Sequence, residues 1–133
     1  MTGRVLIAGN ASGPLLRLES PISFWGGLDP HTGVISDPRH PDHGRRISGT
    51  VLAVPATIGS SSSSAIMLEL LRNGVAPACL LLGRHDGILV LGVIVARELG
   101  YPVIPVIEMA PTALAQLPAD QLVSVTEQGT VLY

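Results

Sequence analysis

Short apolar runs alternate with segments of helical spacing in the second half of the chain, and this order restricts the fold more than any other feature. Buried strands are expected over residues 49–56 (GTVLAVPA), 78–82 (ACLLL) and 103–107 (VIPVI). Residues 65–72 and 88–99 have helical spacing, and a glycine suited to a left-handed helix end follows each of them. The order strand, helix, strand, helix, strand predicts an α/β fold with parallel strands and right-handed crossovers.

The first half of the chain contains two expected strands and a long connection. Residues 4–8 and 15–18 are expected to be short strands joined by a turn in the sequence GNASGP. Residues 20–48 then form a connection rich in Gly, Pro, Asp and His. Phe24 and Trp25 indicate that this connection is ordered, because a solvated linker rarely contains aromatic pairs. Ordered connections of this length usually serve a function.

The length of the chain favours a single domain. A chain of 133 residues can bury about two-thirds of its unfolded surface, so residues 1–133 are expected to form one compact domain. Its tail, residues 121–133, predicts a hairpin with the turn at Gln128–Gly129. The serine run described below does not divide this domain, because neither side of it forms a core of its own.

Charge and hydropathy exclude two classes of partner. The net charge is -2, and the eight basic residues are scattered along the chain, so no phosphate-binding patch is expected. The chain has only four aromatic residues, too few for a base-stacking platform. These two observations exclude nucleic acid as a partner. The longest apolar run, residues 87–96, is too short to cross a bilayer, and the N-terminal sequence lacks a signal-peptide pattern. We therefore expect a cytoplasmic protein without membrane contact.

Metal binding by this chain is not expected. Cys79 is the only cysteine, so it can form no internal disulfide and cannot by itself supply the thiolates of a zinc or iron–sulfur site. Its apolar surroundings are typical of a buried cysteine that acts as a small hydrophobic residue. The sequence DPRHPDHG brings Asp37, His40, Asp42 and His43 together as candidate ligands, but its two prolines constrain the geometry.

Five consecutive serines, Ser60–Ser64, stand between the expected strand 49–56 and the expected helix 65–72. One helix N-cap requires only one serine. The additional serines are explained if the turn faces an anion, which the helix amides, the helix dipole and the hydroxyls would bind. A capped helix with solvated serines is the alternative. This is no phosphate-binding loop of the GxxxxGK[ST] type, because its lysine is missing.

Three long segments resemble the small subunit, or swivel domain, of the aconitase X family of hydro-lyases: PISFWGGLDPHTGVISDPRHPDHG, GSSSSSAIMLELLRNGVAPACLLL and GILVLGVIVARELGYPVI. The resemblance covers nearly the whole chain and implies a compact swivelling β/β/α domain. It also implies a large-subunit partner whose cysteines hold an iron–sulfur cluster, and an activity that requires both chains. The wider superfamily has a Gly-Ser-Ser-Arg turn whose first serine is the catalytic base, and Gly59–Ser60–Ser61 matches it. The resemblance therefore assigns Ser60 as the proton acceptor.

The sequence departs from that turn at Ser62, where the classical enzymes have an arginine that binds a substrate carboxylate. The role of this arginine must be taken by helix amides, by other serines, by the large subunit, or by one of Arg45, Arg46 and Arg84. Residues 22–40 are expected at the mouth of the active site, facing the large subunit. The expected substrate contacts are Ser61, Ser62, Phe24, Trp25, Asp37 and His40. The pair Phe24–Trp25 has an alternative interpretation, in which the rings only anchor the loop in the core.

The resemblance implies dehydration of a small hydroxy acid and leaves two main substrates. Bacterial-type members act on cis-3-hydroxy-L-proline, and archaeal-type members act on mevalonate 5-phosphate. The serine run favours the first, because the archaeal turn begins Gly-Ser-Thr. A different class is also open, in which the chain is a non-catalytic module that binds an anionic metabolite.

Overall fold

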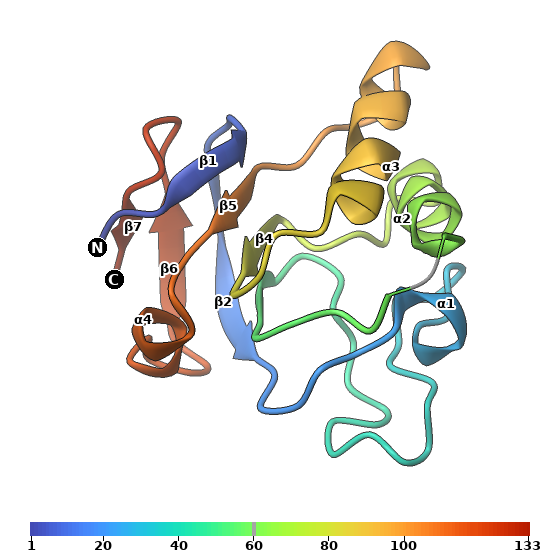
Figure 1. The fold of residues 1–133 in the computed structure, drawn as a ribbon, viewed down its shortest axis with the longest axis horizontal. Coiled ribbons are helices and arrows are strands. Elements are labelled where there is room, and N and C mark those ends of the chain that lie inside the picture. Colours follow the sequence, from blue (N-terminus) through green and yellow to red (C-terminus); the bar gives the residue numbers. More distant parts are fainter. Residues whose placement is uncertain (60) are drawn as a thin grey trace.

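The structure is a computed structural model that describes residues 1–59 and 61–133. Within them the strands form one mixed sheet of seven, in the order β1-β5-β4-β3-β2-β6-β7 (Figure 1). The central strands pair in parallel, as the alternating pattern predicts: β2 (Ala11–Arg17), β3 (Val51–Val54), β4 (Cys79–Leu82) and β5 (Val106–Glu108). The outer strands pair antiparallel: β1 (Arg4–Ile7), β6 (Leu122–Val125) and β7 (Val131–Leu132).

The sheet curls until its two outer edges meet. Thr2 pairs with Thr130, and the amide of Gly3 donates to the carbonyl of Gly129 over 2.9 Å. The two ends of the chain therefore lie side by side (Figure 1). Pairing of the outer strands leaves few free backbone groups at the edges of the sheet, which protects it against edge-to-edge association.

Helices cover both sides of the sheet. The longer pair, α2 (Ser63–Arg72) and α3 (Gly87–Glu98), pack against each other on one side, with the short α1 (Phe24–Gly27) beside α2 (Figure 1). On the other side, α4 (Pro111–Ala115) packs where the sheet curls. These elements form a compact α/β domain with a curled mixed sheet.

The strands β3 and β4 are apolar throughout because each face of the sheet packs in a core of its own. Leu52 and Leu80 belong to the core that includes α2 and α3, whereas their neighbours Val51 and Cys79 belong to the core enclosed by the curled sheet and α4. Successive side chains of a strand point to opposite faces, so a strand buried on both faces needs apolar residues at every position. All four residues of each strand are buried.

Both long helices end as the sequence predicts. Gly74 and Gly100 follow α2 and α3 with φ of +71° and +77°, and each stands at the left-handed position after the helix. The next amide along the chain then donates back into the last turn, from Val75 to Leu70 over 3.0 Å in the first case. This is the paired hydrogen bonding of a Schellman motif, which stops the helix at a defined residue.

Two predicted boundaries are wrong for reasons of tertiary contact. The expected turn GNASGP ends early, because β2 begins at Ala11 and its first four residues pair with β6. Glycine is required at position 13, where a Cβ atom would collide with the carbonyl of Gly49. The strand expected over 103–107 begins at Val106, and two prolines without amide donors precede it. Helix α4 was not expected from the sequence.

Helix α3 carries apolar side chains on its exposed face as well as on its buried face. Leu91 is 49% exposed and Leu99 is 57% exposed. Leu91 and Val95 also line a groove of about 220 Å³ between α2 and α3. Within residues 1–59 and 61–133, no helix has both the length and the apolar character needed to cross a membrane.

Candidate active site

The carboxyl ends of the parallel strands meet at one edge of the sheet. The long connection follows β2, the serine run follows β3, and residues 83–86 follow β4. The first two segments remain paired beyond their strands, since Ile22 bridges Thr57 and the amide of Ile58 donates to the carbonyl of Ile22 over 2.9 Å. Ligands of α/β sheets commonly bind at this edge. The candidate active site is therefore placed here.

The serine turn and its helix form as predicted over the described part, residues 61–74. Ser60, the predicted proton acceptor, lies outside the described residues. Ser62 occupies the N-cap position of α2, and its side chain makes no cap bond to the first-turn amides. Ser64 Oγ approaches the carbonyl of Ser61 at 3.5 Å, the limit for a hydrogen bond. The hydroxyl at the N-cap position therefore does not cap the first turn of α2.

Ser63 differs from the other described serines. Its side chain is 1% exposed, and its hydroxyl has no hydrogen-bond partner among the described residues. A buried hydroxyl without a partner costs about 1–3 kcal/mol of desolvation. Ser63 therefore does not stabilise the start of α2 as a cap.

A pocket of about 570 Å³ is lined in part by Ile58, which stands two residues before the serine run in the sequence. Its other lining residues all come from the long connection: Pro21, Ile22, Ser23, Trp25, Gly26, Gly27, Asp37, Pro38, Arg39 and His40. Three residues expected to contact substrate, Trp25, Asp37 and His40, thus line one pocket. The sequence alone does not show that Ile58 belongs to the same wall.

The aromatic pair is divided between core and pocket. Phe24 is completely buried and packs in the core beneath α2 and α3, and it does not line the pocket. Trp25 is 58% exposed and does line it. The chain can present successive rings in opposite directions because Trp25 and Gly26 leave helical geometry, with φ of +81° at Gly26. The interpretation as a core anchor is confirmed for Phe24, and the contact of Trp25 with a ligand stays a prediction.

Asp37 and Arg39 form a charged pair in the wall of the pocket. Asp37 Oδ1 accepts a hydrogen bond from the backbone amide of Arg39 over 2.9 Å and forms an ion pair with its Nε over 3.4 Å. The amide bond, more than the guanidinium, lowers the pKa of the Asp37 carboxyl below its ordinary value. Asp37 is therefore an anion at neutral pH, and both of its contacts with Arg39 are made by Oδ1.

His40 has a structural role. Its Nδ1 accepts a hydrogen bond from the amide of Asp42 over 3.0 Å, and its Nε2 lies 3.3 Å from the carbonyl of Ser20. With Nδ1 accepting from Asp42 and Nε2 within hydrogen-bond distance of Ser20, both ring nitrogens have a partner. His40 therefore lines the pocket while both of its ring nitrogens are engaged by the backbone.

The loop after β4 contains a contact that our sequence analysis missed. Thr57 Oγ1 donates to Asp86 Oδ2 over 2.6 Å, and Asp86 Oδ1 accepts from the amides of Ile88 and Leu89 at the start of α3. Asp86 therefore caps α3 and also holds the segment that leads to the serine run. An aspartate directly before an apolar helix is a recognised N-cap signal, but its bond to Thr57 is tertiary.

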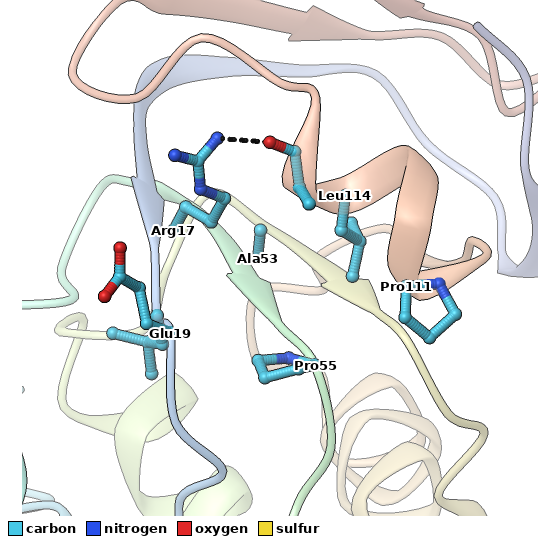
Figure 2. A pocket seen from close by; sticks show the side chains of 8 residues that line it. Arg17, Glu19, Ala53, Pro55, Pro111 and Leu114 are labelled. Atoms are coloured by element: carbon cyan, nitrogen blue, oxygen red, sulfur yellow. Dashed lines mark hydrogen bonds between the residues drawn. The ribbon is translucent and has the colours of Figure 1, made fainter.

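A second, smaller pocket of about 260 Å³ lies between the end of β2 and α4 (Figure 2). Arg17 points across it and donates to the carbonyl of Ala115 over 3.0 Å (Figure 2). It also donates to the carbonyl of Leu117. These bonds satisfy carbonyls at the end of α4. The Nη1 donors of Arg17 are thereby engaged in holding α4.

The described residues do not fit a metal or an iron–sulfur cluster. No group of three His, Cys, Asp or Glu side chains among them is placed to hold a metal ion. Cys79 is buried in the second core, and burial raises the pKa of its thiol to about 12. A ligating thiolate is therefore strongly disfavoured at this position.

We predict that the native Cys79 thiol is inert to alkylation. A pKa of about 12, against an ordinary value of 9.0, lowers the thiolate fraction at pH 8 roughly 10³-fold, and burial excludes the reagent. Iodoacetamide labelling followed by mass spectrometry should give slow labelling without urea and rapid labelling in it. Because the thiol ionises near pH 9 in the unfolded chain and near pH 12 in the folded one, its contribution to the free energy of unfolding is fully present below pH 9. This contribution is lost as the pH rises towards 12. Equal labelling rates with and without urea would contradict the prediction.

The whole chain, residues 1–133, matches the aconitase X swivel domain family. The fold superposes on the crystal structure of Thermococcus kodakaraensis aconitase X in its holo-form, with a TM-score of 0.86 and 28% identity over 99% of this chain and 97% of that one.

Relatives of two kinds match the chain. It is 42% identical over 129 residues (97% of this chain) to a cis-3-hydroxy-L-proline dehydratase from Hypocrea jecorina. It is 49% identical over 96 residues (72% of this chain) to a cis-3-hydroxy-L-proline dehydratase from Pseudomonas aeruginosa. The chain spans only 22% and 17% of the lengths of these two relatives. It is also 36% identical over 110 residues (83%) to the phosphomevalonate dehydratase small subunit of Thermococcus onnurineus, covering 82% of that protein. In sequence and fold, the chain belongs to the aconitase X swivel domain family.

Proposed function

We propose that this chain is the small subunit, or swivel domain, of a cytoplasmic hydro-lyase that converts cis-3-hydroxy-L-proline to 1-pyrroline-2-carboxylate. Its family, and relatives named cis-3-hydroxy-L-proline dehydratase at 42% and 49% identity, support this. Only one edge of the domain carries the candidate site, so an aconitase X large subunit supplies the opposite wall. We place the iron–sulfur cluster implied by the family on that subunit.

In this proposal the chain contributes the base and the groups that orient the substrate. Dehydration removes the proton at Cα of the substrate while hydroxide leaves from C3, which forms an enamine with a double bond between C2 and C3. Loss of the N–H proton and protonation of C3 then convert this enamine to 1-pyrroline-2-carboxylate. Ser60 accepts the proton. The start of α2 lies next to it in sequence, and its backbone amides and positive dipole end stabilise the developing negative charge in a closed site. The cluster on the large subunit supplies Lewis-acid chemistry when bound.

The charge of the pocket wall is the observation that favours hydroxyproline over mevalonate 5-phosphate. Asp37 is an anion, and Arg39, the one cationic side chain among the described lining residues, is already paired with it. A secondary ammonium group, such as that of hydroxyproline, suits an ionised carboxylate. A substrate that carries both a phosphate and a carboxylate would instead need unpaired cations.

Replacing Asp37 by asparagine tests this choice. The substituted side chain keeps an oxygen that can accept from the Arg39 amide but loses the charge that faces the ammonium. KM for cis-3-hydroxy-L-proline should rise about tenfold, while kcat changes little, because a charge-assisted hydrogen bond to the bound substrate is lost. Steady-state kinetics of the two-subunit enzyme would measure this, with Asp120→Asn as the control at an exposed position outside the pocket. An unchanged KM would remove Asp37 from the site.

The proposed function itself is tested by reconstitution. Co-expression with an aconitase X large subunit should yield a complex that dehydrates cis-3-hydroxy-L-proline, and neither chain alone should do so. The same preparation should be assayed with mevalonate 5-phosphate, because five further relatives at 34–40% identity are also named phosphomevalonate dehydratase small subunit. Turnover of that substrate alone would identify the second activity. Binding without turnover of either substrate would identify a non-catalytic module.

A further inference from the structure

The serine run lacks the arginine that would bind a substrate carboxylate, and the structure limits which other cation can replace it. The eight basic residues of the chain are all arginines. Ion pairs with carboxylates engage four of them: Arg4, Arg39, Arg45 and Arg72. Arg17 is engaged by carbonyls near α4. Among the described residues, the arginines with neither an ion pair nor such carbonyl bonds are Arg46, Arg84 and Arg97.

Topology separates these three arginines. Arg46 lies in the segment that leads into the amino end of β3, and Arg97 lies in the last turn of α3. With a rise of 1.5 Å per residue, that turn is about 15 Å from the start of the helix. Arg84 is exposed in the loop that follows the carboxyl end of β4, at the edge that carries the serine run. Among the described residues, only Arg84 therefore combines a position at the correct edge of the sheet with a guanidinium outside both the ion pairs and the carbonyl bonds.

Two contacts fix the loop of Arg84 against the segment that enters the serine run. On one side, the amide of Gly83 donates to the carbonyl of Val54 over 2.8 Å, and a Cβ atom at position 83 would collide with the carbonyl of Pro55. On the other side, Asp86 binds the Thr57 hydroxyl. Arg84 stands between these anchors. Its backbone is thus held next to residues 55–57, a few residues before the predicted base.

We propose that Arg84 binds the carboxylate of the hydroxy-acid substrate, in place of the arginine that the serine turn lacks. The inference rests on the proposed function. A guanidinium presents two parallel N–H donors that match a carboxylate, and it remains charged at any pH at which the protein is folded. The glycine at position 83 and the Thr57–Asp86 bond act as positioning elements that keep this group beside the turn.

The test compares Arg84→Gln, Arg84→Lys and Arg97→Gln in the reconstituted two-subunit enzyme. For the hydroxy acid that is turned over, Arg84→Gln should raise KM by about 10- to 100-fold, the scale for one charged hydrogen-bonded pair, with a smaller change in kcat. Arg84→Lys should fall between Arg84→Gln and wild type, since a lysine keeps the charge without the fork. Arg97→Gln removes an exposed charge at the far end of α3 and should behave as wild type.

An uncharged analogue separates substrate binding from a structural role. The amide of cis-3-hydroxy-L-proline, used as a competitive inhibitor, should bind wild-type enzyme at least about tenfold more weakly than the acid, and Arg84→Gln should bind the two almost equally. If Arg84→Gln keeps the KM of Arg97→Gln, or keeps full discrimination against the amide, the assignment is overturned while the proposed function stands. If the wild-type complex turns over neither hydroxy acid, the proposed function fails and this inference fails with it.

Discussion

Replacing Ser60 by alanine is expected to lower turnover of the reconstituted enzyme by about 10²-fold or more, the usual scale for a positioned general base. Association with the large subunit and thermal stability should remain close to wild type. Three reasons support the expectation. Ser60 directly follows Gly59 where the chain passes from β3 to α2, the turn contains no His, Glu, Lys or Tyr, and Gly59–Ser60–Ser61 matches the turn of the superfamily.

Exchange of the substrate's Cα proton with solvent reports on proton abstraction directly. In D₂O, wild-type enzyme should exchange the Cα proton of the substrate with solvent if the abstraction is reversible, and Ser60→Ala should lose exchange and turnover together. Ser63→Ala is the matched control, because it removes the hydroxyl of a buried serine with no partner among the described residues. That variant should keep its activity and be neutral or more stable by up to about 1 kcal/mol. Normal turnover in Ser60→Ala would exclude Ser60 as the base.

The second large effect is expected where α2 and α3 cross. Gly92 is buried in α3, and a Cβ atom there would lie 2.5 Å from the carbonyl oxygen of Ser64 and 3.0 Å from Cβ of Met67. Gly92→Ala must therefore push α2 away from α3. We expect it to lower the free energy of unfolding by about 1–3 kcal/mol, which exceeds the gain of up to about 1 kcal/mol in helix propensity.

Gly87→Ala is the control on the same helix. A Cβ atom at position 87 would meet only His85 Nε2, at an ordinary distance of 3.5 Å. This variant should be neutral or slightly more stable, because alanine favours the helix. Urea unfolding of the three proteins measures the difference. Since Ser64 belongs to the serine run, Gly92→Ala should also reduce turnover in the complex. Equal stabilities of Gly92→Ala and Gly87→Ala would show that the helices can separate without cost.

The order of the elements was predictable because local patterns encode it. Apolar runs four to five residues long marked β3 and β4, and the glycines after α2 and α3 stood where left-handed backbone ends a helix. The hairpin at the end of the chain was also predicted, and its turn has Gly129 with φ of +83°. Each of these signals depends on a few neighbouring residues, so a single sequence is sufficient to detect it.

The candidate site was predicted in part. The run Ser60–Ser64 and the residues Trp25 and Asp37 were identified from sequence, and the structure brings the last two together beside Ile58. The pattern did not separate Phe24, which anchors the loop in the core, from Trp25, which lines the pocket. It also gave no reason to choose Arg84 over Arg45, whose guanidinium is paired with Asp42 and Asp120.

By itself, then, the sequence determined the fold class, the family and the serine run at the start of a helix. Only the tertiary structure decided which side chains share a wall and which charges are already neutralised. The Thr57–Asp86 bond joins residues 29 positions apart, and the Arg45–Asp120 pair joins residues 75 apart. Contacts at such separations depend on how the strands align in the sheet. Local periodicity carries no information about that alignment until the cores on both faces are packed.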